Sequence, residues 1–325
     1  MVKKSNVWEL ASLCVSSDNQ STHPIKSNSP IKSLHHYTVN EITPYVNWAY
    51  FLHTWSLPTS FSALANVHRC PGCQSAWINA QPEASKGKAI EAVRLFNDAW
   101  EVLAHFIERD FRAHSLVRLV DANADGDDVL LACGERIPLL RQQHERASEP
   151  CLCLSDFVRP LSTGRTDKIG LFVSSCDVAM EESFPNDPYR HMLAQTLADR
   201  LAEAAIEKTH QYVRTTLWAY APEERLSPQE LFSEKYQGIR PAVGYPSLPD
   251  QSLNFILDKL LGFQQVGVSL TESGAMRPHA SVSGLMLSHP AARYFTVGTI
   301  GKDQFLDYAI RRGMDAGELA RYLTM

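Results

Sequence analysis

The chain is 325 residues long and 44% hydrophobic, so it holds enough apolar side chains for a full-sized core in one large domain or two smaller ones. Its 31 Lys and Arg residues against 36 Asp and Glu residues give a formal net charge of -5, which argues against nucleic acid as a partner. No run of about 18 apolar residues occurs, which argues against a membrane span. The seven cysteines are too sparse for a disulfide scaffold, so we expect a cytoplasmic protein.

Composition divides the chain into a tail and a body. Residues 1–36 are rich in Ser, Asn, Lys and Pro, and they are expected to form a loosely ordered tail because they bury little apolar surface. A dense aromatic and aliphatic pattern begins after residue 36, and residues 37–325 are interpreted as one domain. Within it, residues 56–87 turn to Pro, Ser, Asn, Cys and Gly, which predicts an irregular Cys-containing loop.

Helices are predicted where apolar residues recur at three- and four-residue steps. The first begins near Lys88. Its expected buried face consists of Ile90, Val93, Phe96, Trp100, Leu103 and Ile107. The longest follows Asp187-Pro188, in which a capping side chain precedes a residue whose missing N–H costs nothing at the first helical position. Shorter helices are expected after the capping box at 227–230, at 253–261, at 303–312 and at 316–323.

Strand patterns occur in pairs separated by short turns. Residues 116–120 and 129–134 are expected to form a hairpin, residues 167–176 a further strand, and residues 281–288 and 293–300 a second pair. Irregular alternation of helices with such pairs favours an α+β fold, with a twisted, mainly antiparallel sheet and helices packed on it.

The segment DANADG at 121–126 begins like a calcium-binding EF-hand loop, whose oxygen ligands suit a hard cation. The twelfth position of that loop is Ala132, where a bidentate carboxylate is required. Because both flanks read as strands, a hairpin turn is the better account.

A second candidate metal or redox motif combines His68 with the pair Cys70 and Cys73. A structural zinc site needs four ligands at paired spacing, and the next closely spaced pair of cysteines, Cys151 and Cys153, is distant. Two thiols in a surface loop are therefore the favoured interpretation, and a metal or redox role is the alternative.

Other common active-site motifs are missing from the sequence. It has no Gly-rich phosphate loop, which leaves nucleotide binding at a helix N-terminus without support. It also lacks a nucleophile elbow and a HExxH metal helix. Hydrolysis by a standard triad or by zinc-bound water is therefore not supported.

The loop YQGIRPAVGYP at 236–246 is the most informative stretch. Arg240 precedes Pro241 and is biased toward extended backbone, Gly244 permits a positive φ or a close approach to a ligand, and Tyr245 offers a flat face. A guanidinium, open backbone groups and an aromatic plane within six positions suit an amino-acid carboxylate joined to an adenosine. Taken alone, the loop is better explained as a structural turn than as a binding loop.

The segment RPAVGY at 240–245 resembles the Arg-x-x-x-Gly-Tyr signature of the activation domain of cobalamin-dependent methionine synthase, which binds S-adenosylmethionine. The likeness continues in order along the chain and covers nearly everything from Tyr37 to the end. It is carried by residues 48–57, 153–158, 197–204, 220–227, 236–242, 270–273, 280–290 and 307–314. The resemblance implies the fold of that domain.

The resemblance also assigns the loop residues. Arg240 is expected to pair with the carboxylate of S-adenosylmethionine, for which a planar guanidinium suits better than Lys. Backbone groups at Ala242 and Tyr245 are expected to hold the adenine end, with the Tyr245 ring alongside and Gly244 between them in the signature.

Two further positions match site residues of the family, namely Glu203 on the long helix and Tyr294 near the C-terminus. Without the resemblance, Glu203 would be read as part of a solvated helix face, because Asp199, Glu203 and Glu207 share an i,i+4 row. Tyr294 alone would be read as a core aromatic of a strand.

The chain departs from the family in Tyr45-Val46-Asn47-Trp48, where Asn47 stands at a position usually held by Asp. That Asp is expected to face the ammonium group of the ligand. Asn still accepts a hydrogen bond but lacks the charge, so a loss of about 1 kcal/mol, or several-fold in affinity, is expected.

By resemblance, the chain binds S-adenosylmethionine and presents its methyl group for reductive remethylation of cob(II)alamin on a separate methionine synthase core, in methionine biosynthesis. A flavodoxin-like protein would donate the electron. Such a methyltransferase component needs positioning rather than proton transfer, so no catalytic residue and no metal ligand is assigned.

The Asp-x-His-x-x-Gly motif that supplies a cobalt ligand is missing, and only a tail precedes the domain. We therefore expect a stand-alone reactivation component that works in trans, rather than a complete methionine synthase. The alternative is a non-catalytic S-adenosylmethionine sensor, or a reactivation chaperone for another corrinoid protein.

Overall fold

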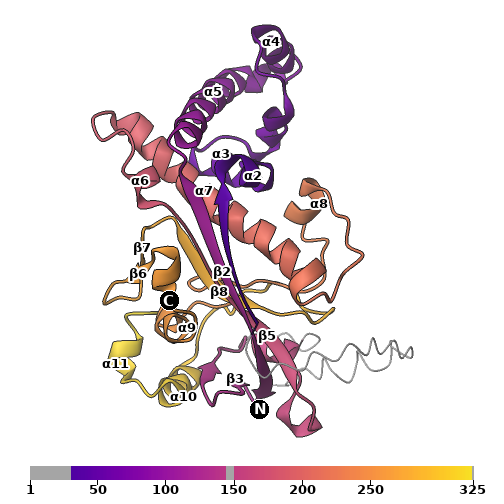
Figure 1. Ribbon diagram of the computed structural model, residues 1–325, viewed down its shortest axis with the longest axis vertical. Coiled ribbons are helices and arrows are strands. Elements are labelled where there is room, and N and C mark those ends of the chain that lie inside the picture. The colour runs from indigo at the N-terminus through magenta and orange to yellow at the C-terminus, as the bar shows by residue number, and fades with distance from the viewer. Residues whose placement is uncertain (1–30, 144–149, 324–325) are drawn as a thin grey trace.

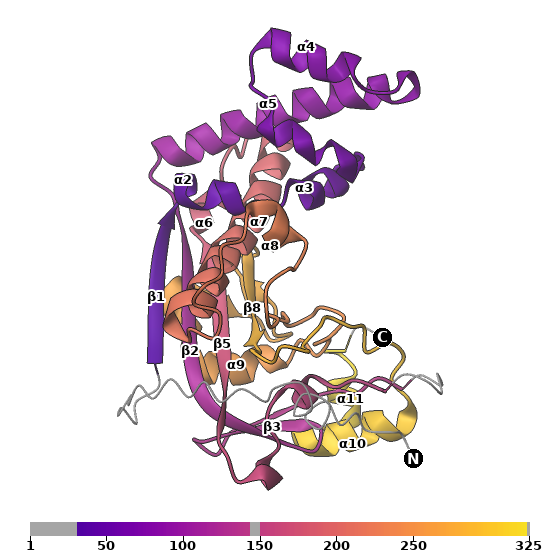
Figure 2. The same ribbon diagram turned by 90° about the vertical axis from the view of Figure 1, so that its right-hand side faces the viewer.

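The computed structural model describes residues 31–143 and 150–323, shown from two sides in Figures 1 and 2. The strands are β1 (Ile31–Thr38), β2 (Arg112–Asp125), β3 (Asp128–Leu131), β4 (Arg136–Pro138), β5 (Asp167–Cys176), β6 (Ser269–Leu270), β7 (Met276–Arg277) and β8 (Ser281–Met286). The α-helices are α2 (Val39–Ile42), α3 (Trp48–Thr54), α4 (Pro71–Asn79), α5 (Lys86–Glu108), α6 (Val178–Glu181), α7 (Pro188–Tyr212), α8 (Pro228–Phe232), α9 (Leu253–Leu261), α10 (Lys302–Arg312) and α11 (Ala316–Leu319).

The main sheet is antiparallel and is built around β2. Its strand order is β4-β3-β2-β5-β8. β1 and β3 pair with the same edge of β2, β1 at residues 112–119 and β3 at residues 122–125. Along the opposite edge, β5 pairs with β2 from Ala113 to Ala122, and β8 then pairs with β5. Helices pack on both sides of this sheet (Figures 1 and 2), which confirms the α+β prediction.

Alternate residues of β2 face different layers. Val117 and Leu119 pack in one cluster with Ile206 of α7, whereas Leu116 packs in another cluster with Leu257 of α9. The sheet therefore separates a layer formed by α7 from a layer formed by α9 and the loops around it.

Helix α7 begins as the sequence predicts. The Asp187 side chain accepts a hydrogen bond from the N–H of Arg190 at 3.1 Å, and Pro188 occupies the first helical position. The predicted apolar stripe is buried, with Leu193, Leu197, Leu201 and Ala205 at 0–1% exposure. The helix continues into a π-helical turn at Val213–Leu217.

Helix α5 is present where the sequence predicts it, but its buried face is rotated. Ile90 is 57% exposed and Ile107 is 40% exposed, although both were assigned to the core face. Small residues share the buried face instead, at Ala89, Ala92 and Ala99. A prediction that uses only the large apolar residues therefore places the middle of the buried face of α5 wrongly.

Two predicted boundaries are wrong. β1 begins at Ile31, so ordered structure starts before residue 37, and the rest of the predicted tail lies outside the described residues. Most of residues 56–87 is helical rather than irregular, with a 3₁₀ segment at Thr59–Asn66, helix α4 and a 3₁₀ turn at Glu83–Ser85. The cap at Cys70 and Pro71 at the first helical position start α4 despite the Pro- and Gly-containing composition.

The predicted strand at 293–300 is also wrong. β8 is present, but its partner is β5, and its other edge is bonded to the loop that carries Arg240. There Leu285 N–H donates to Pro241 C=O and Val243 N–H donates to Ser283 C=O. Because both edges of β8 are occupied, residues 293–300 lie outside the sheet and form no regular secondary structure.

Local signals elsewhere are confirmed. DANAD belongs to the end of β2, and Gly126 at φ 66° begins the turn to β3, as a hairpin requires. Helix α9 spans residues 253–261 and ends at Gly262, whereas α11 is shorter than predicted and ends at Leu319. Within residues 31–143 and 150–323, no helix is both long and apolar enough to cross a bilayer.

Candidate ligand-binding site

A cavity of about 510 Å³ lies where four distant segments of the chain meet. The segments are residues 45–50, 200–207 on α7, 231–247 and 294–296. Of the seven residues predicted from the sequence, six line the cavity, namely Asn47, Glu203, Arg240, Ala242, Tyr245 and Tyr294. The volume falls in the usual range of small-molecule sites.

Arg240 lies at the centre of the polar part of the cavity. Its guanidinium forms an ion pair with Glu207 and lies 3.7 Å from the carboxylate of Glu203, both on α7. Its backbone N–H donates to the hydroxyl of Tyr294 at 3.0 Å. The structure therefore brings together three of the residues that the resemblance assigned from separate parts of the sequence.

The protonation states of this cluster follow from its surroundings. Burial is the largest single effect and disfavours the charged form of Arg240. The neighbouring side chains, Glu207 foremost, together outweigh burial and raise the pKa of Arg240, which stays cationic. Burial raises the pKa of Tyr294, so its phenol stays neutral. The cavity thus holds a fixed cation beside two acidic side chains of one helix.

Two buried atoms of the cluster are left unpaired by the described part of the chain. They are Nε of Arg240 and Oε1 of Glu207. An unsatisfied buried polar atom costs about 1–3 kcal/mol. A site that reserves a donor and an acceptor in this way fits a ligand that carries both an anionic and a cationic group.

Tyr245 borders the cavity and is 49% exposed. Its hydroxyl donates to the carboxylate of Glu203 at 2.8 Å, which links the loop to α7 a second time. The Glu203 charge and burial raise the pKa of Tyr245, so the hydroxyl remains a donor at neutral pH.

Gly244 is the predicted residue that does not line the cavity. It lies at φ 86°, and its N–H donates to Leu248 C=O at 2.9 Å. A Cβ at this position would meet Oε1 of Gln251 at 2.8 Å. Gly244 therefore shapes the turn that presents Tyr245, because a side chain there would be strained and crowded.

The backbone groups assigned to the adenine end are bonded to their own loop. The N–H of Tyr245 donates to Ala242 C=O at 3.2 Å, and Tyr245 C=O accepts from Leu248 N–H at 2.9 Å. A carbonyl oxygen retains a second lone pair, so both oxygens keep acceptor capacity toward a ligand.

Asn47 has a structural role beside its place in the cavity wall. Its Oδ1 accepts a hydrogen bond from the N–H of Ala49 at 3.1 Å and caps helix α3. An Asp at this position would provide the same cap and add a charge.

Sequence reasoning missed several residues of the cavity wall. Glu207 was read as part of a solvated face, but it is 5% exposed and pairs with Arg240. Its place one helical turn after Glu203 was the available signal. Arg200 and Glu234 also line the cavity, and no local pattern pointed to Glu234.

Glu234 occupies an unusual backbone position. It follows the end of α8 at φ 54°, in the left-handed region that favours glycine, and its N–H donates to Leu231 C=O at 3.0 Å. Burial raises the pKa of its carboxyl, with Arg240 acting in the opposite direction. A strained non-glycine residue whose side chain lines a cavity points to a functional demand.

Comparisons with known proteins agree with this geometry. A family model described as "Vitamin B12 dependent methionine synthase, activation domain" matches residues 38–313. A solved structure described as "Crystal Structure of the MetH Reactivation Domain bound to AdoHcy" is similar to this chain, with 34% sequence identity and a TM-score of 0.78. The match covers 99% of this chain and 98% of that chain. Both findings confirm the resemblance that the loop at 240–245 carries.

Proposed function

This chain belongs to the family of vitamin B12 dependent methionine synthase activation domains, and from that premise we propose that it binds S-adenosylmethionine in the cavity around Arg240. It presents the methyl group to a cobalamin carried by a separate methionine synthase core, and a flavodoxin-like protein supplies the electron. The observation that carries this proposal is the guanidinium of Arg240 held between two carboxylates of α7 in a ligand-sized cavity.

The charges of the cavity complement those of the ligand. Among the described residues that line it, Glu203, Glu207 and Glu234 outnumber Arg200 and Arg240 by one. S-adenosylmethionine carries a carboxylate, an ammonium and a sulfonium, so its net charge is positive by one. The excess carboxylate therefore favours the sulfonium form over its neutral-sulfur product.

The two carboxylates of α7 have different parts in this arrangement. Glu207 is buried and pairs closely with Arg240, so it fixes the orientation of the guanidinium. Glu203 is more exposed and lies farther from the guanidinium, at 3.7 Å. The ligand carboxylate takes its place on Arg240 at the Glu203 side, where the existing pair is the looser one.

Bound S-adenosylmethionine supplies an electrophilic methyl group, which passes to the reduced cobalt of the partner and leaves S-adenosylhomocysteine. The chain itself moves no proton in this step. Its residues orient the ligand so that the methyl group faces outward, which is a gain in proximity and alignment. Tyr50 and Tyr245, which are exposed at the cavity, provide apolar faces for the adenine.

Calorimetry with S-adenosylmethionine tests the binding part of the proposal. Arg240→Ala is expected to weaken binding at least ~10-fold, because a charge-assisted hydrogen bond contributes about 1.5–3 kcal/mol. Arg240→Lys keeps the charge but loses the planar fork, so an intermediate affinity is expected. Arg225→Ala, which removes an exposed guanidinium outside the cavity, is the matched control.

Because Arg240 is held in a buried ion pair, thermal melts of each variant must accompany the titrations. A folded Arg240→Ala protein with unchanged affinity would contradict the assignment of the site. A folded Arg240→Lys protein provides the same test if the Ala variant does not fold.

Reconstitution tests the transfer part of the proposal. The chain is mixed with a cobalamin-loaded methionine synthase core that lacks an activation domain, a flavodoxin-type donor and methyl-labelled S-adenosylmethionine. Label is expected in the cobalamin of the core. Tight binding of S-adenosylmethionine without any transfer of label would reject the reactivation role and favour a sensor of this metabolite.

A further inference from the structure

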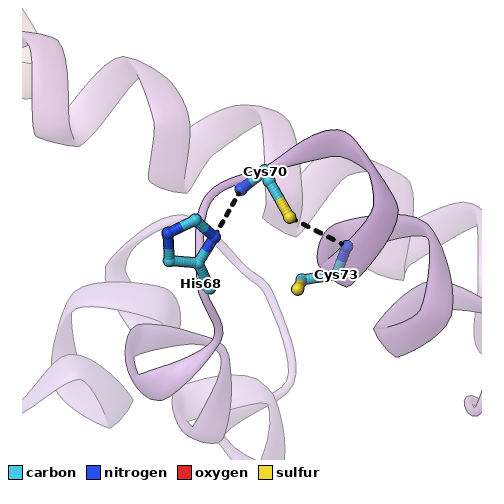
Figure 3. A group of neighbouring side chains, drawn as sticks. All are labelled: His68, Cys70 and Cys73. Carbon is cyan, nitrogen blue, oxygen red and sulfur yellow. Dashed lines mark hydrogen bonds between the residues drawn. The ribbon is translucent and has the colours of Figure 1, made fainter.

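Three side chains with soft donor atoms meet at the start of helix α4, as Figure 3 shows. One ligand atom each from His68, Cys70 and Cys73 lies within 4.8 Å of the others. From the sequence, the favoured interpretation is two thiols in a surface loop. The structure places the imidazole of His68 beside both thiols. None of the three is among the described residues that line the cavity around Arg240.

The local backbone prepares this cluster for metal binding. Cys70 caps α4, and the N–H of Cys73 donates to its Sγ at 3.4 Å. The N–H of Cys70 donates to Nδ1 of His68 at 3.3 Å, which holds the imidazole against the start of the helix.

Helix α5 fixes the segment that carries the three ligands. Arg69 stacks on the ring of Trp100 at 4.8 Å. On the other side of the cluster, Gln74 and Asn97 exchange two hydrogen bonds of 2.7 and 3.3 Å. The ligands are therefore gathered by contacts of the protein itself, which lowers the ordering cost of binding an ion.

Helix α4 is otherwise weakly attached. It is 9 residues long, and none of its residues is fully buried. A helix of this length is marginal by itself, so it depends on tertiary contacts such as that of Trp77 with Phe61. An ion bound to residues 68, 70 and 73 would fasten the start of the helix to the preceding loop.

We propose that His68, Cys70 and Cys73 bind one zinc ion through two thiolates and an imidazole. Zinc takes such ligands at about 2.3 Å for sulfur and about 2.0–2.1 Å for nitrogen in a tetrahedral arrangement. The ligand atoms of such a site lie roughly 3.5–3.8 Å apart, a separation that small side-chain rotations reach from the present cluster. The fourth position stays open to water or to a donor atom of another molecule.

Cobalt(II) substitution in the full-length, tag-free chain tests this proposal. The chain is stripped with a chelator, kept reduced and titrated with Co²⁺ and then with Zn²⁺. The expected result is a thiolate-to-cobalt charge-transfer band with the visible bands of a four-coordinate site, saturating at one ion per chain and lost when Zn²⁺ is added. The absence of a thiolate band in the reduced chain would overturn the proposal.

Variants locate the site. Cys70→Ser and Cys73→Ser are each expected to abolish the thiolate band or to weaken binding beyond the ~10–100-fold typical of outer-shell changes. His68→Ala is expected to keep thiolate bands at reduced affinity. Cys133→Ser and His53→Ala, which change exposed residues elsewhere, are the matched controls and should bind like the parent. Equal loss in Cys133→Ser would overturn the assignment.

Hydrogen exchange gives a second measurement. Zn²⁺ is expected to slow exchange in residues 71–79 of the parent and to have no such effect in Cys70→Ser. If the two thiols instead form a disulfide in air and the reduced chain binds neither metal, the pair is a redox couple and the zinc proposal is wrong. Neither result depends on binding of S-adenosylmethionine, which is measured separately.

Discussion

Asn47 combines an observed structural role with a proposed binding role on the same atom. Its Oδ1 is already bonded to the N–H of Ala49, so a ligand ammonium must share that oxygen. The amide can cap the helix as well as an Asp does, but it brings no charge to the cavity. We therefore expect this departure from the family pattern to affect affinity and to leave the helix cap unchanged.

We expect Asn47→Asp to tighten binding of S-adenosylmethionine several-fold, because a charge-assisted hydrogen bond is about twice as strong as a neutral one. Isothermal titration calorimetry at low and at high salt measures the change, which should shrink as salt screens the added charge. Asn47→Ser keeps a capping side chain without charge and serves as the control. Equal affinities of Asn47→Asp and the parent would show that residue 47 does not meet the ligand ammonium.

Only part of the cluster around Arg240 is predictable from the sequence, because some of its residues are close in the chain and others are not. The loop signature identified Arg240 and Tyr245 because their chemistry is local to six positions of sequence. The row on α7 places Glu207 on the same face as Glu203, but it does not predict that Glu207 is buried, since that burial depends on a cation 33 positions away. Local charge patterns indicate a solvated face unless the distant partner is known.

At the scale of elements, the residue that follows α8 meets two opposing requirements. The backbone there favours glycine, whereas the cavity wall has a carboxylate at the same position. Glu234 takes the left-handed backbone position that follows the helix, where Gly would be unstrained. Its carboxylate nevertheless supplies part of the negative charge of the cavity wall. We infer that the side chain is retained for binding although the backbone favours glycine.

Glu234→Gly is expected to raise the free energy of unfolding by up to about 1.5 kcal/mol. Relief of left-handed strain contributes ~1–2 kcal/mol, and the greater freedom of Gly in the unfolded chain offsets ~0.5–1 kcal/mol of it. Binding of S-adenosylmethionine should weaken. Denaturant unfolding and calorimetry measure the two quantities.

Glu234→Gln separates the two effects, because it removes the charge and keeps the strained backbone. We expect its stability to stay within about 0.5 kcal/mol of the parent and its affinity to fall as in the Gly variant. A Gln variant that binds like the parent would remove Glu234 from the site.

The elements that the sequence predicted well are those with complete local signals. Asp187-Pro188 and the capping box at 227–230 start helices α7 and α8, and Gly262 ends α9. The failure at 293–300 has a different origin, since its composition suits a strand equally well. The edge of β8 that it would need is bonded to the loop at 239–243, which is a tertiary fact that no local pattern contains.

At the scale of the whole molecule, several ionisable groups are buried between α7 and the loops. His210 is fully buried, and burial together with the cations Arg214 and Arg240 lowers its pKa well below the ordinary value. The folded protein therefore holds His210 neutral, whereas the unfolded chain takes up a proton as the pH falls through about 6.5. The unfolded state binds more protons in that range, so acidification favours it.

We expect the free energy of unfolding to be independent of this histidine above about pH 6.5 and to decrease as the pH falls below that value. Urea denaturation at a series of pH values measures the slope. His210→Phe keeps a flat ring against Tyr236 and removes the titration, so its stability should depend less on pH over the same range. Parallel slopes for the two proteins would show that His210 does not cause the dependence.

The strands β2 and β5 contribute residues to three of the hydrophobic clusters, through Ala113 and Cys176, Leu116 and Val173, and Val117 and Phe172. The layer formed by α7 and the layer formed by α9 therefore pack on the same two strands. Neither layer has strands of its own that would stay folded when the other layer unfolds. Heating should produce a single calorimetric peak whose van't Hoff and measured enthalpies coincide. After a cut between β5 and α7, the N-terminal fragment would keep β2 and β5 but would lose α7 and α9, which cover them, so it should fold only when its complement is added back.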